Sequence, residues 1–182
     1  MSRAGKNLIK IPSGVTVVQN DGLISVKGPK GELFVRTDTA NAGKVAVEIA
    51  DGGVTVTPSG DKDAATRSMW GTMARNIKQA ITGVTEGFSK SMGMKGVGYK
   101  AVIKGKDLVL TAGYSHDVVM PIPNGLTVDV TAATEFTIKG IDKGMVGEFA
   151  DKVRKVRLPE PYKGKGIFYA DEKIHRKEGK KK

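Results

Sequence analysis

The sequence predicts an α+β protein of two similar, duplicated units, each a mostly antiparallel sheet with one packed helix, followed by a basic extended C-terminal tail. Short strand-like runs followed by one helical stretch favour α+β units over a doubly wound sheet. The same order of runs then occurs a second time along the chain, which is typical of an internal duplication. The net positive charge is concentrated at the C-terminal end, because residues 152–182 hold twelve Lys or Arg against four Asp or Glu.

The first unit is predicted to span residues 1–82 and to begin with a β-meander. Short runs between residues 8 and 58 are bounded by Gly, Pro, Asn or Asp, as in strands joined by tight turns. These runs are LIKI, VTVV, LISVKG, ELFVR, VAVEI and VTVTP. From residue 61 apolar side chains recur every three or four positions, which predicts a helix with one buried face. The predicted face consists of Thr66, Trp70, Met73, Ala74, Ile77 and Ile81.

The second unit is predicted over residues 83–158 with the same order of elements. Its strand-like runs are FSKSM, YKAVIKG, LVLTAG, DVVMP, LTVDV and FTIKG. A helix is predicted to begin near Asp142 and to be stopped by Pro159, since a proline disfavours helical geometry in the residue before it. Its predicted apolar face consists of Met145, Phe149, Val153 and Val156.

The two halves align in pattern more than in identity. Residues 23–28 lie over 108–113 in this alignment. The two helices align with Trp70, Ala74 and Ile77 over Phe149, Val153 and Val156. Internal duplication explains the pattern, and convergence of two similar small sheets is the alternative.

Composition narrows the class of protein. The chain has no cysteine, which excludes disulfides, thiolate metal sites and cysteine nucleophiles. Neither histidine belongs to a recognisable catalytic or metal-binding constellation, and Asp117 beside His116 is interpreted as a polar turn. No apolar stretch reaches the length of a signal peptide core or a membrane span. We therefore expect no catalytic residues, no metal, no cofactor, no small-molecule substrate and no membrane partner.

One string resembles a nucleotide-binding motif. Residues 96–101 read GVGYKA, which matches the G-x-G-x-x-G/A fingerprint by letter. That fingerprint needs a helix after it to receive the pyrophosphate, whereas strand-like runs follow here. We interpret the glycines as a bulge or hairpin between the first strands of the second unit.

The C-terminal tail, residues 159–182, is predicted to bind a polyanion. The net charge is +11 for the whole chain, and residues 152–182 supply most of it. In the string PEPYKGKGI, Lys163 and Lys165 lie beside Gly164 and Gly166, whose missing side chains let a phosphate backbone come close. Tyr162 and Tyr169 could stack on an unpaired base or pack beneath the tail. A charged loop folded back over the second helix is the alternative, and the residues alone leave both open.

The string at residues 159–167 also carries a resemblance to a known family. It fits each position of a C-terminal signature: Pro, an acidic or polar residue, any residue, Tyr-Lys, Gly or Ala, Lys-Gly and an aliphatic residue. Similar features are the opening Ile11-Pro12, the turn VKGPKG at residues 26–31 and the segment GVGY at residues 96–99. On these residues the chain resembles the bacterial ribosomal protein L6 (uL6) family over essentially its whole length.

The resemblance implies a non-enzymatic structural protein of the large (50S) ribosomal subunit, cytoplasmic and ribosome-bound. It implies binding to 23S rRNA, mainly through the C-terminal domain and tail, near the sarcin-ricin loop, the stalk base and the elongation-factor binding region. Neighbouring ribosomal proteins are expected partners, and elongation factors are expected nearby. Carried over by position, the rRNA-binding candidates are Tyr162, Lys163, Gly164, Lys165 and Gly166, and then Lys173, Arg176, Lys177 and Lys180.

Two further candidates come from helical periodicity. Arg154 and Lys155 project away from the apolar face that holds Phe149 and Val153, so they extend the basic surface or are solvated helix charges. Two other classes of function stay open from the residues alone. One is an enzyme acting on nucleotides or nucleic acid, and the other is a protein-protein adaptor that uses an exposed sheet edge.

Overall fold

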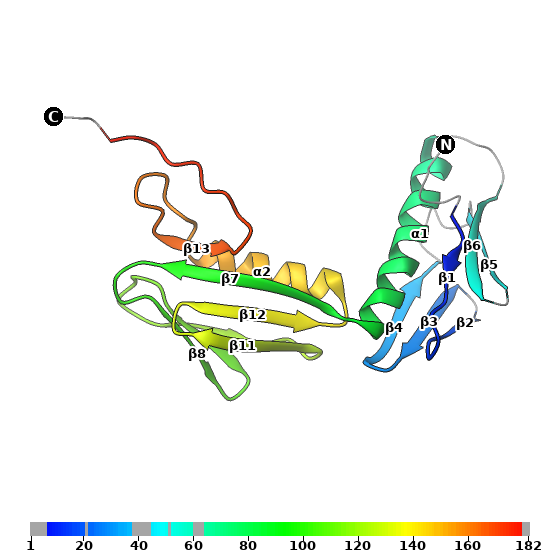
Figure 1. Cartoon of the computed structure of the whole chain (residues 1–182), viewed down its shortest axis with the longest axis horizontal. Coiled ribbons are helices and arrows are strands. Elements are labelled where there is room, and N and C mark those ends of the chain that lie inside the picture. The colour runs from blue at the N-terminus through cyan, green and yellow to red at the C-terminus, as the bar shows by residue number, and fades with distance from the viewer. Residues whose placement is uncertain (1–6, 21, 38–44, 51, 60–63, 180–182) are drawn as a thin grey trace. The chain divides into compact units, whose positions relative to one another are not determined.

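The computed structural model describes residues 7–20, 22–37, 45–50, 52–59 and 64–179, which form two compact units, Met1–Gly87 and Phe88–Lys182 (Figure 1). The helix of the first unit, α1 (Ala64–Thr85), runs past residue 82, and the division falls between Gly87 and Phe88. The boundaries 1–82, 83–158 and 159–182 stay predictions of the sequence.

Within the described residues the first unit contains α1 and two three-stranded antiparallel sheets. The strand orders are β2-β3-β4 and β1-β6-β5. Each predicted strand-like run contains one strand. Consecutive strands are neighbours throughout only in β2-β3-β4, whereas β1 pairs with β6 and β4 does not pair with β5, so the prediction of one meander over the whole run is wrong. The bounds are β1 (Ile9–Lys10), β2 (Thr16–Asn20), β3 (Leu23–Gly28), β4 (Gly31–Arg36), β5 (Val45–Ala50) and β6 (Gly53–Pro58).

Helix α1 buries the face that its periodicity predicts. Each of the six predicted side chains is buried, and the apolar ones pack in one core with residues of β3 and β6. Trp70 belongs to this core, and its indole Nε1–H donates a hydrogen bond of 2.6 Å to the carbonyl oxygen of Val56. A buried indole needs such an acceptor, so Trp70 is a packing residue with a fixed polar contact.

We expect Trp70→Phe to lower the free energy of unfolding by about 1–3 kcal/mol, because the Val56 carbonyl loses this donor and the smaller ring leaves space. Urea denaturation followed by far-UV circular dichroism measures the change, since Trp70 is the only tryptophan and its fluorescence is lost. Phe34→Leu, at an exposed aromatic side chain of β4, is the control and should change stability by less than about 0.5 kcal/mol. Equal effects of the two variants would contradict the role given to Trp70.

The second unit, within the described residues, contains α2 (Lys143–Val156) and two antiparallel sheets. The strand orders are β10-β9-β8 and β11-β12-β7-β13. Asp142 caps α2, because its carboxylate accepts a 2.7 Å hydrogen bond from the amide of Gly144. The bounds are β7 (Phe88–Lys95), β8 (Lys100–Lys104), β9 (Asp107–Thr111), β10 (Val118–Pro121), β11 (Leu126–Ala132), β12 (Glu135–Gly140) and β13 (Gly166–Tyr169).

The buried face of α2 differs from the predicted one at its start. Val146, Phe149, Ala150 and Val153 are buried, whereas Met145 is 36% exposed. At about 100° per residue these four side chains share one arc of the helix, and Met145 lies at the margin of that arc. The prediction of Met145 as a core residue is therefore wrong.

The two units have the same topology. The order β2-β3-β4 in the first unit corresponds to β8-β9-β10 in the second, and β1-β6-β5 corresponds to β7-β12-β11. The aligned segments 23–28 and 108–113 cover β3 and all but the first residue of β9, which are the middle strands of the sheets β2-β3-β4 and β8-β9-β10. In each unit the helix follows the sixth strand. The predicted pair of similar sheet-and-helix units is confirmed.

Strand β13 distinguishes the second unit from the first. It pairs antiparallel with β7, with Ile167 opposite Met94, and Ile167 is fully buried. The prediction of an extended tail beyond residue 158 is therefore wrong for residues 166–169, which form this strand. A strand is recognised in a sequence by alternating apolar and polar residues, and a run of four residues after a glycine-rich loop is too short to show this alternation. The burial of Ile167 therefore could not be predicted from the sequence.

The glycines at residues 96–98 form a turn, but not a hairpin or a bulge. They connect β7 to β8, which belong to different sheets and do not pair. Gly98 has a φ of +75°, and a Cβ on Gly96 would lie 2.5 Å from the ring of Tyr99. The Tyr99 side chain is buried in the core, so Gly96 provides the space that this ring needs. Strand β8 follows in place of the helix that a dinucleotide would require.

Candidate nucleic-acid interface

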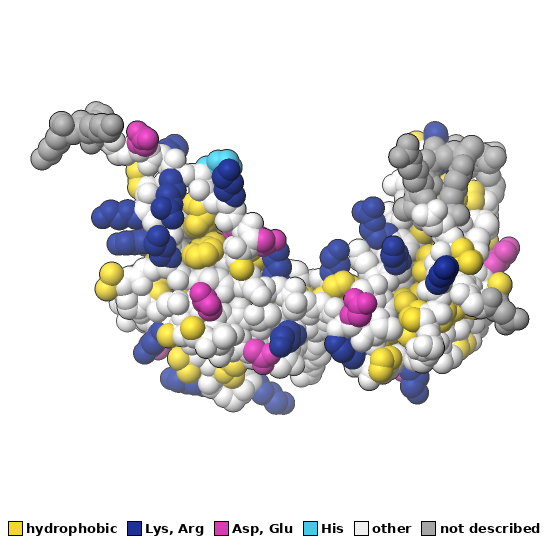
Figure 2. Space-filling view, in the orientation of Figure 1, with side chains coloured by type: hydrophobic (Ala, Val, Ile, Leu, Met, Phe, Trp, Pro, Cys, Tyr) yellow, Lys and Arg dark blue, Asp and Glu magenta, His cyan; other side chains and the backbone are white. Residues whose placement is uncertain are grey.

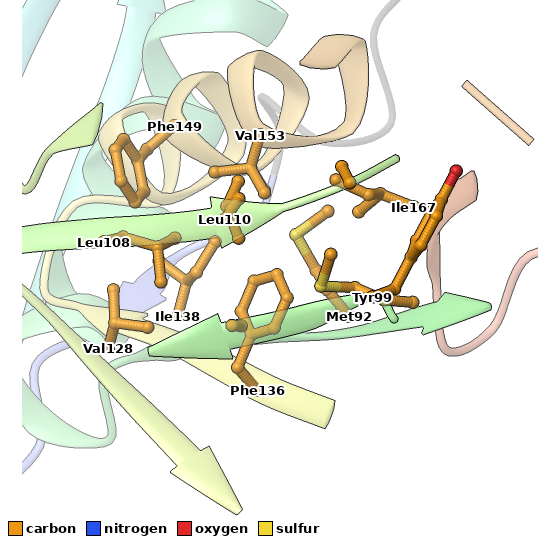
Figure 3. Close-up of a cluster of buried hydrophobic side chains, with 14 of the residues drawn as sticks. Met92, Tyr99, Leu108, Leu110, Val128, Phe136, Ile138, Phe149, Val153 and Ile167 are labelled. Carbon is orange, nitrogen blue, oxygen red and sulfur yellow. The ribbon is translucent and has the colours of Figure 1, made fainter. Parts of the chain in front are cut away.

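Strand β13 positions the basic C-terminal segment on the second unit. After α2 the chain turns at residues 161–163 and returns beside β7 as β13. The amide of Ile167 donates to the carbonyl oxygen of Arg157 at 2.8 Å, which ties the strand to the end of α2. The Ile167 side chain points into the core that contains Phe149 and Val153 (Figure 3). The loop before β13 is therefore held at both ends by the folded unit.

Residues beyond β13 return to the same loop. The amide of Lys177 donates to the carbonyl oxygen of Pro161 at 2.7 Å, and a Cβ on Gly164 would lie 3.4 Å from Nε of Arg176. The amide of Glu160 also donates to the carbonyl oxygen of Lys165 at 2.9 Å, which closes the loop on itself. The structure thus has a charged loop folded back on its own unit, and binding of a polyanion by this loop stays a prediction.

This arrangement brings together most of the predicted contact residues. Figure 2 shows Lys and Arg side chains gathered over this part of the second unit. The basic side chains of the loop and of the segment after β13 form no ion pair with a residue that the structure describes; they are Lys163, Lys165, Lys173, Arg176 and Lys177. An aromatic side chain, Tyr162, stands among them and is 58% exposed. We define the C-terminal basic surface as the exposed side chains of Tyr162, Lys163, Lys165, Lys173, Arg176 and Lys177.

The fold of the loop itself requires glycine at positions 164 and 166. Gly166 has a φ of +144°, and a Cβ there would lie 2.6 Å from the carbonyl oxygen of Leu158. Gly164 has a φ of +69° and is buried beneath Arg176. Close approach of a phosphate is the reason for these glycines that the sequence alone predicts. Backbone packing is a second reason, and RNA contact at Gly164 and Gly166 stays a prediction.

Arg154 and Lys155 are not counted in the C-terminal basic surface, because each forms an ion pair with a carboxylate. Nε of Arg154 lies 2.9 Å from Oε2 of Glu172, and its side chain is 25% exposed. Lys155 pairs with Asp151 one helical turn earlier, at 2.7 Å. The hydrogen bond to Glu172 raises the pKa of Arg154, and the same bond lowers the pKa of Glu172. Arg154 thus fastens the turn after β13 to α2.

A second ion pair holds the same turn to β7. Nζ of Lys90 lies 3.0 Å from Oδ1 of Asp171 and 4.7 Å from the centre of the Tyr169 ring. The guanidinium of Arg154 lies 5.6 Å from the same ring. Tyr169 is thus half-buried, with two cations close to its ring. Of the two roles predicted for Tyr169, this position fits packing beneath the tail and not stacking on an unpaired base. Neither Lys90 nor Glu172 was identified from the sequence, because their partners lie far away along the chain.

The Arg154–Glu172 pair predicts a dependence of stability on pH. Because Glu172 has a lowered pKa in the folded state, its contribution is complete above its ordinary value of 4.5 and is lost as the pH falls through the lowered value. We expect Glu172→Gln to lower the Tm by about 3–5 °C at neutral pH, and this difference to shrink in acid.

Thermal unfolding at pH 7 and in steps below pH 4.5 measures the effect. Glu148→Gln is the control, because Glu148 pairs with Lys152 at 2.7 Å but is exposed, so little change in Tm is expected. A difference in Tm for Glu172→Gln that stays constant down to the acid limit would argue against the ion pair as its cause.

Other kinds of site find no support in the part of the chain that the structure describes. No group of three or more His, Asp or Glu side chains there is placed to hold a metal ion. Neither described helix has the length and hydropathy to cross a membrane. Lys180, the last of the predicted contact residues, lies outside the described residues.

The chain is similar to one family in both of its units. The family model described as ribosomal protein L6 matches residues 11–87 and again residues 95–170. Relatives named large ribosomal subunit protein uL6 match over at least 99% of both chains. The relative from Parvibaculum lavamentivorans is 50% identical over 182 residues, with 100% of each chain covered. The relative from Halothermothrix orenii is 51% identical over 180 residues, with 99% of each chain covered.

Proposed function

The chain belongs to the ribosomal protein L6 family, and we propose that it binds 23S ribosomal RNA mainly through its second unit and the C-terminal basic surface. As a bacterial L6 protein it is a structural, non-enzymatic component of the large ribosomal subunit and is ribosome-bound in the cytoplasm. This excludes the nucleotide-dependent enzyme that the string at residues 96–101 left open.

The observation that carries the RNA-binding proposal is the C-terminal basic surface itself. Five cations on two adjacent segments are exposed and have no acidic partner among the described residues. Unpaired cations on a fixed backbone release counterions from a phosphate chain when they bind it, which favours association. Tyr162 offers a ring that can stack on an unpaired base.

The residues have different parts in this proposal. Lys163, Lys165, Lys173, Arg176 and Lys177 contact phosphates, which fixes the position and orientation of the protein without reading sequence. Gly164 and Gly166 shape the loop that presents the two lysines. Arg154 acts through Glu172 by holding the end of β13 in place, and Lys155 is a lesser contact because Asp151 already neutralises it.

The proposed location follows from the family resemblance. We place the protein near the sarcin-ricin loop, the stalk base and the region where elongation factors bind. Its other partners in this proposal are neighbouring proteins of the large subunit. An influence on elongation factors would then be indirect, through the position of the RNA that the C-terminal basic surface holds.

Binding of the purified full-length chain to 23S rRNA at several salt concentrations tests the proposal. With five phosphate contacts, the logarithm of the association constant should fall with the logarithm of the salt concentration with a slope of about −3 to −5. Affinity that does not depend on salt would rule out phosphate contacts as the main interaction. Chain that sediments free of large subunits at low salt, with no copurifying rRNA, would refute the proposed function as a whole.

A further inference from the structure

Strand β1 of the first unit has an edge with which no strand in the described part of the chain pairs. Among the described residues it pairs only with β6, and the amide of Ile11 donates to the carbonyl oxygen of Gly52 at 3.2 Å. Ile9 lies opposite Val54, two positions earlier in the same ladder. In an antiparallel ladder every second residue turns its peptide groups toward the same partner. The N–H and C=O of Lys10 therefore point away from β6, toward the open side.

A groove lies along this edge, between β1 and α1, with a volume of about 870 Å³. One wall carries Leu8, whose side chain is 56% exposed. The cations that line the groove have no ion pair with a residue that the structure describes. Glu86 is the acidic residue among the described lining. The lining includes the apolar side chains of Leu8, Ile11 and Ile81 and the cations Lys10, Arg75 and Lys78.

The second unit fills the corresponding position with a strand of its own. There β7 corresponds to β1, and β13 pairs with the edge of β7 that faces away from β12. Ile167 of β13 is fully buried in the core beside α2. Three residues after β13, Glu172 binds Arg154 of α2. A buried aliphatic side chain and a following carboxylate are thus two of the contacts that fix this strand against α2.

The cation that binds the carboxylate has a counterpart in the first unit. The alignment that places Trp70 over Phe149 and Ala74 over Val153 also places Arg75 over Arg154. Arg75 lines the groove beside β1 and is exposed, whereas Arg154 is held by Glu172. The first unit therefore has the edge, the groove and the arginine, while the described residues supply no strand to use them.

We propose that the β1 edge and its groove bind an extended segment of another large-subunit protein, as a fourth strand of the β1-β6-β5 sheet. The segment places an aliphatic side chain in the groove, as β13 places Ile167, and an acidic side chain against Arg75, as Glu172 lies against Arg154. This interaction belongs to the first unit and goes beyond the RNA binding proposed for the second.

A polypeptide fits this surface better than RNA does. A strand edge presents N–H and C=O groups alternately, and an added strand satisfies both kinds. A phosphate chain offers acceptors, so it would leave the Lys10 carbonyl and the apolar wall at Leu8 without partners. The same chain already uses a peptide strand at the equivalent edge.

Photo-crosslinking in intact large subunits tests the proposal. Thr82 lines the groove and is partly exposed, so p-benzoylphenylalanine in its place reports what occupies the groove. Subunits that contain the substituted full-length chain are purified and irradiated, and the crosslinked product is identified by mass spectrometry. The expected product is a segment of a large-subunit protein that has an aliphatic residue followed within a few positions by Asp or Glu.

Charge variants test the role given to Arg75. Arg75→Gln should lower the crosslink yield about fivefold, because the acidic side chain loses its bonded cation. Asn76→Glu is the matched control, since it lowers the net charge by the same amount on an exposed neighbour that does not line the groove. Lys78→Gln serves as a second groove variant, and thermal unfolding of each purified variant checks the fold.

Three outcomes would overturn the proposal. The first is a crosslink to ribosomal RNA in place of protein, and the second is no crosslink in subunits that carry the substituted chain. The third is a protein crosslink whose yield is unchanged by both Arg75→Gln and Lys78→Gln. None of these outcomes affects RNA binding by the C-terminal basic surface, because that surface lies in the other unit.

Discussion

Replacing both Lys163 and Lys165 by glutamate is expected to lower incorporation of the protein into large subunits at least about tenfold, because two phosphate contacts become repulsive. The slope of binding to 23S rRNA against salt should become shallower by about 2. Both side chains are exposed and unpaired among the described residues, so the fold of the isolated protein should stay intact. Mass spectrometry of subunits from cells that express tagged variant and wild type together measures the competition.

The same unit supplies a matched control for this variant. Lys104 and Lys106 flank Gly105 in the turn between β8 and β9 and repeat the sequence Lys-Gly-Lys. Gly105 has a φ of +62°, close to the +69° of Gly164, and both lysines are exposed. Replacing them by glutamate changes the net charge by the same amount at another place. Equal loss of incorporation for the two double variants would mean that total charge matters and that the position of the C-terminal loop does not.

Shortening Ile167 to alanine is expected to lower the free energy of unfolding by about 2–4 kcal/mol, as for other fully buried aliphatic side chains. The side chain joins β13 to the core of the second unit, so its loss also loosens the loop that carries Lys163 and Lys165. Urea denaturation measures the stability, and the rate of trypsin cleavage after the two lysines measures the loosening.

Ile103→Ala is the control for this substitution. Ile103 lies on β8 of the same unit and is 38% exposed, so the same chemical change should cost less than about 1 kcal/mol. A variant at Ile167 that is as stable as this control, with unchanged cleavage by trypsin, would mean that β13 does not hold the loop.

The sequence predicted the parts of the fold that repeat at a regular spacing. The buried face of α1 followed from positions three and four residues apart, and Trp70 was correctly placed in the core. The alignment of the two halves also predicted two units with the same order of elements. These signals are local, since each depends on side chains within one helix or one strand.

The parts that were missed depend on contacts between distant segments. β13 pairs with β7, which ends about seventy residues earlier, and nothing in the sequence of either strand indicates that the two pair. Arg154 was interpreted as an RNA contact or a solvated helix charge, because nothing in the spacing indicates its bond to Glu172. The adaptor hypothesis involves an exposed sheet edge, but only the topology shows that β1 is the edge strand equivalent to β7, whose edge β13 occupies in the second unit.

The position of β13 also sets the order in which the protein can fold during its own synthesis. All strands of the first unit precede α1, so that unit is complete in sequence by Gly87. The second unit begins with β7 and is completed by β13, which ends at Tyr169. At a synthesis rate of about 5–20 residues per second, the edge of β7 stays unpaired for roughly 4–16 s before β13 has been made. A nascent chain released before Gly166 would keep that edge open and prone to pair with other chains. Completion of the second unit, and with it the presentation of the basic loop, is therefore delayed until Tyr169 has been synthesised.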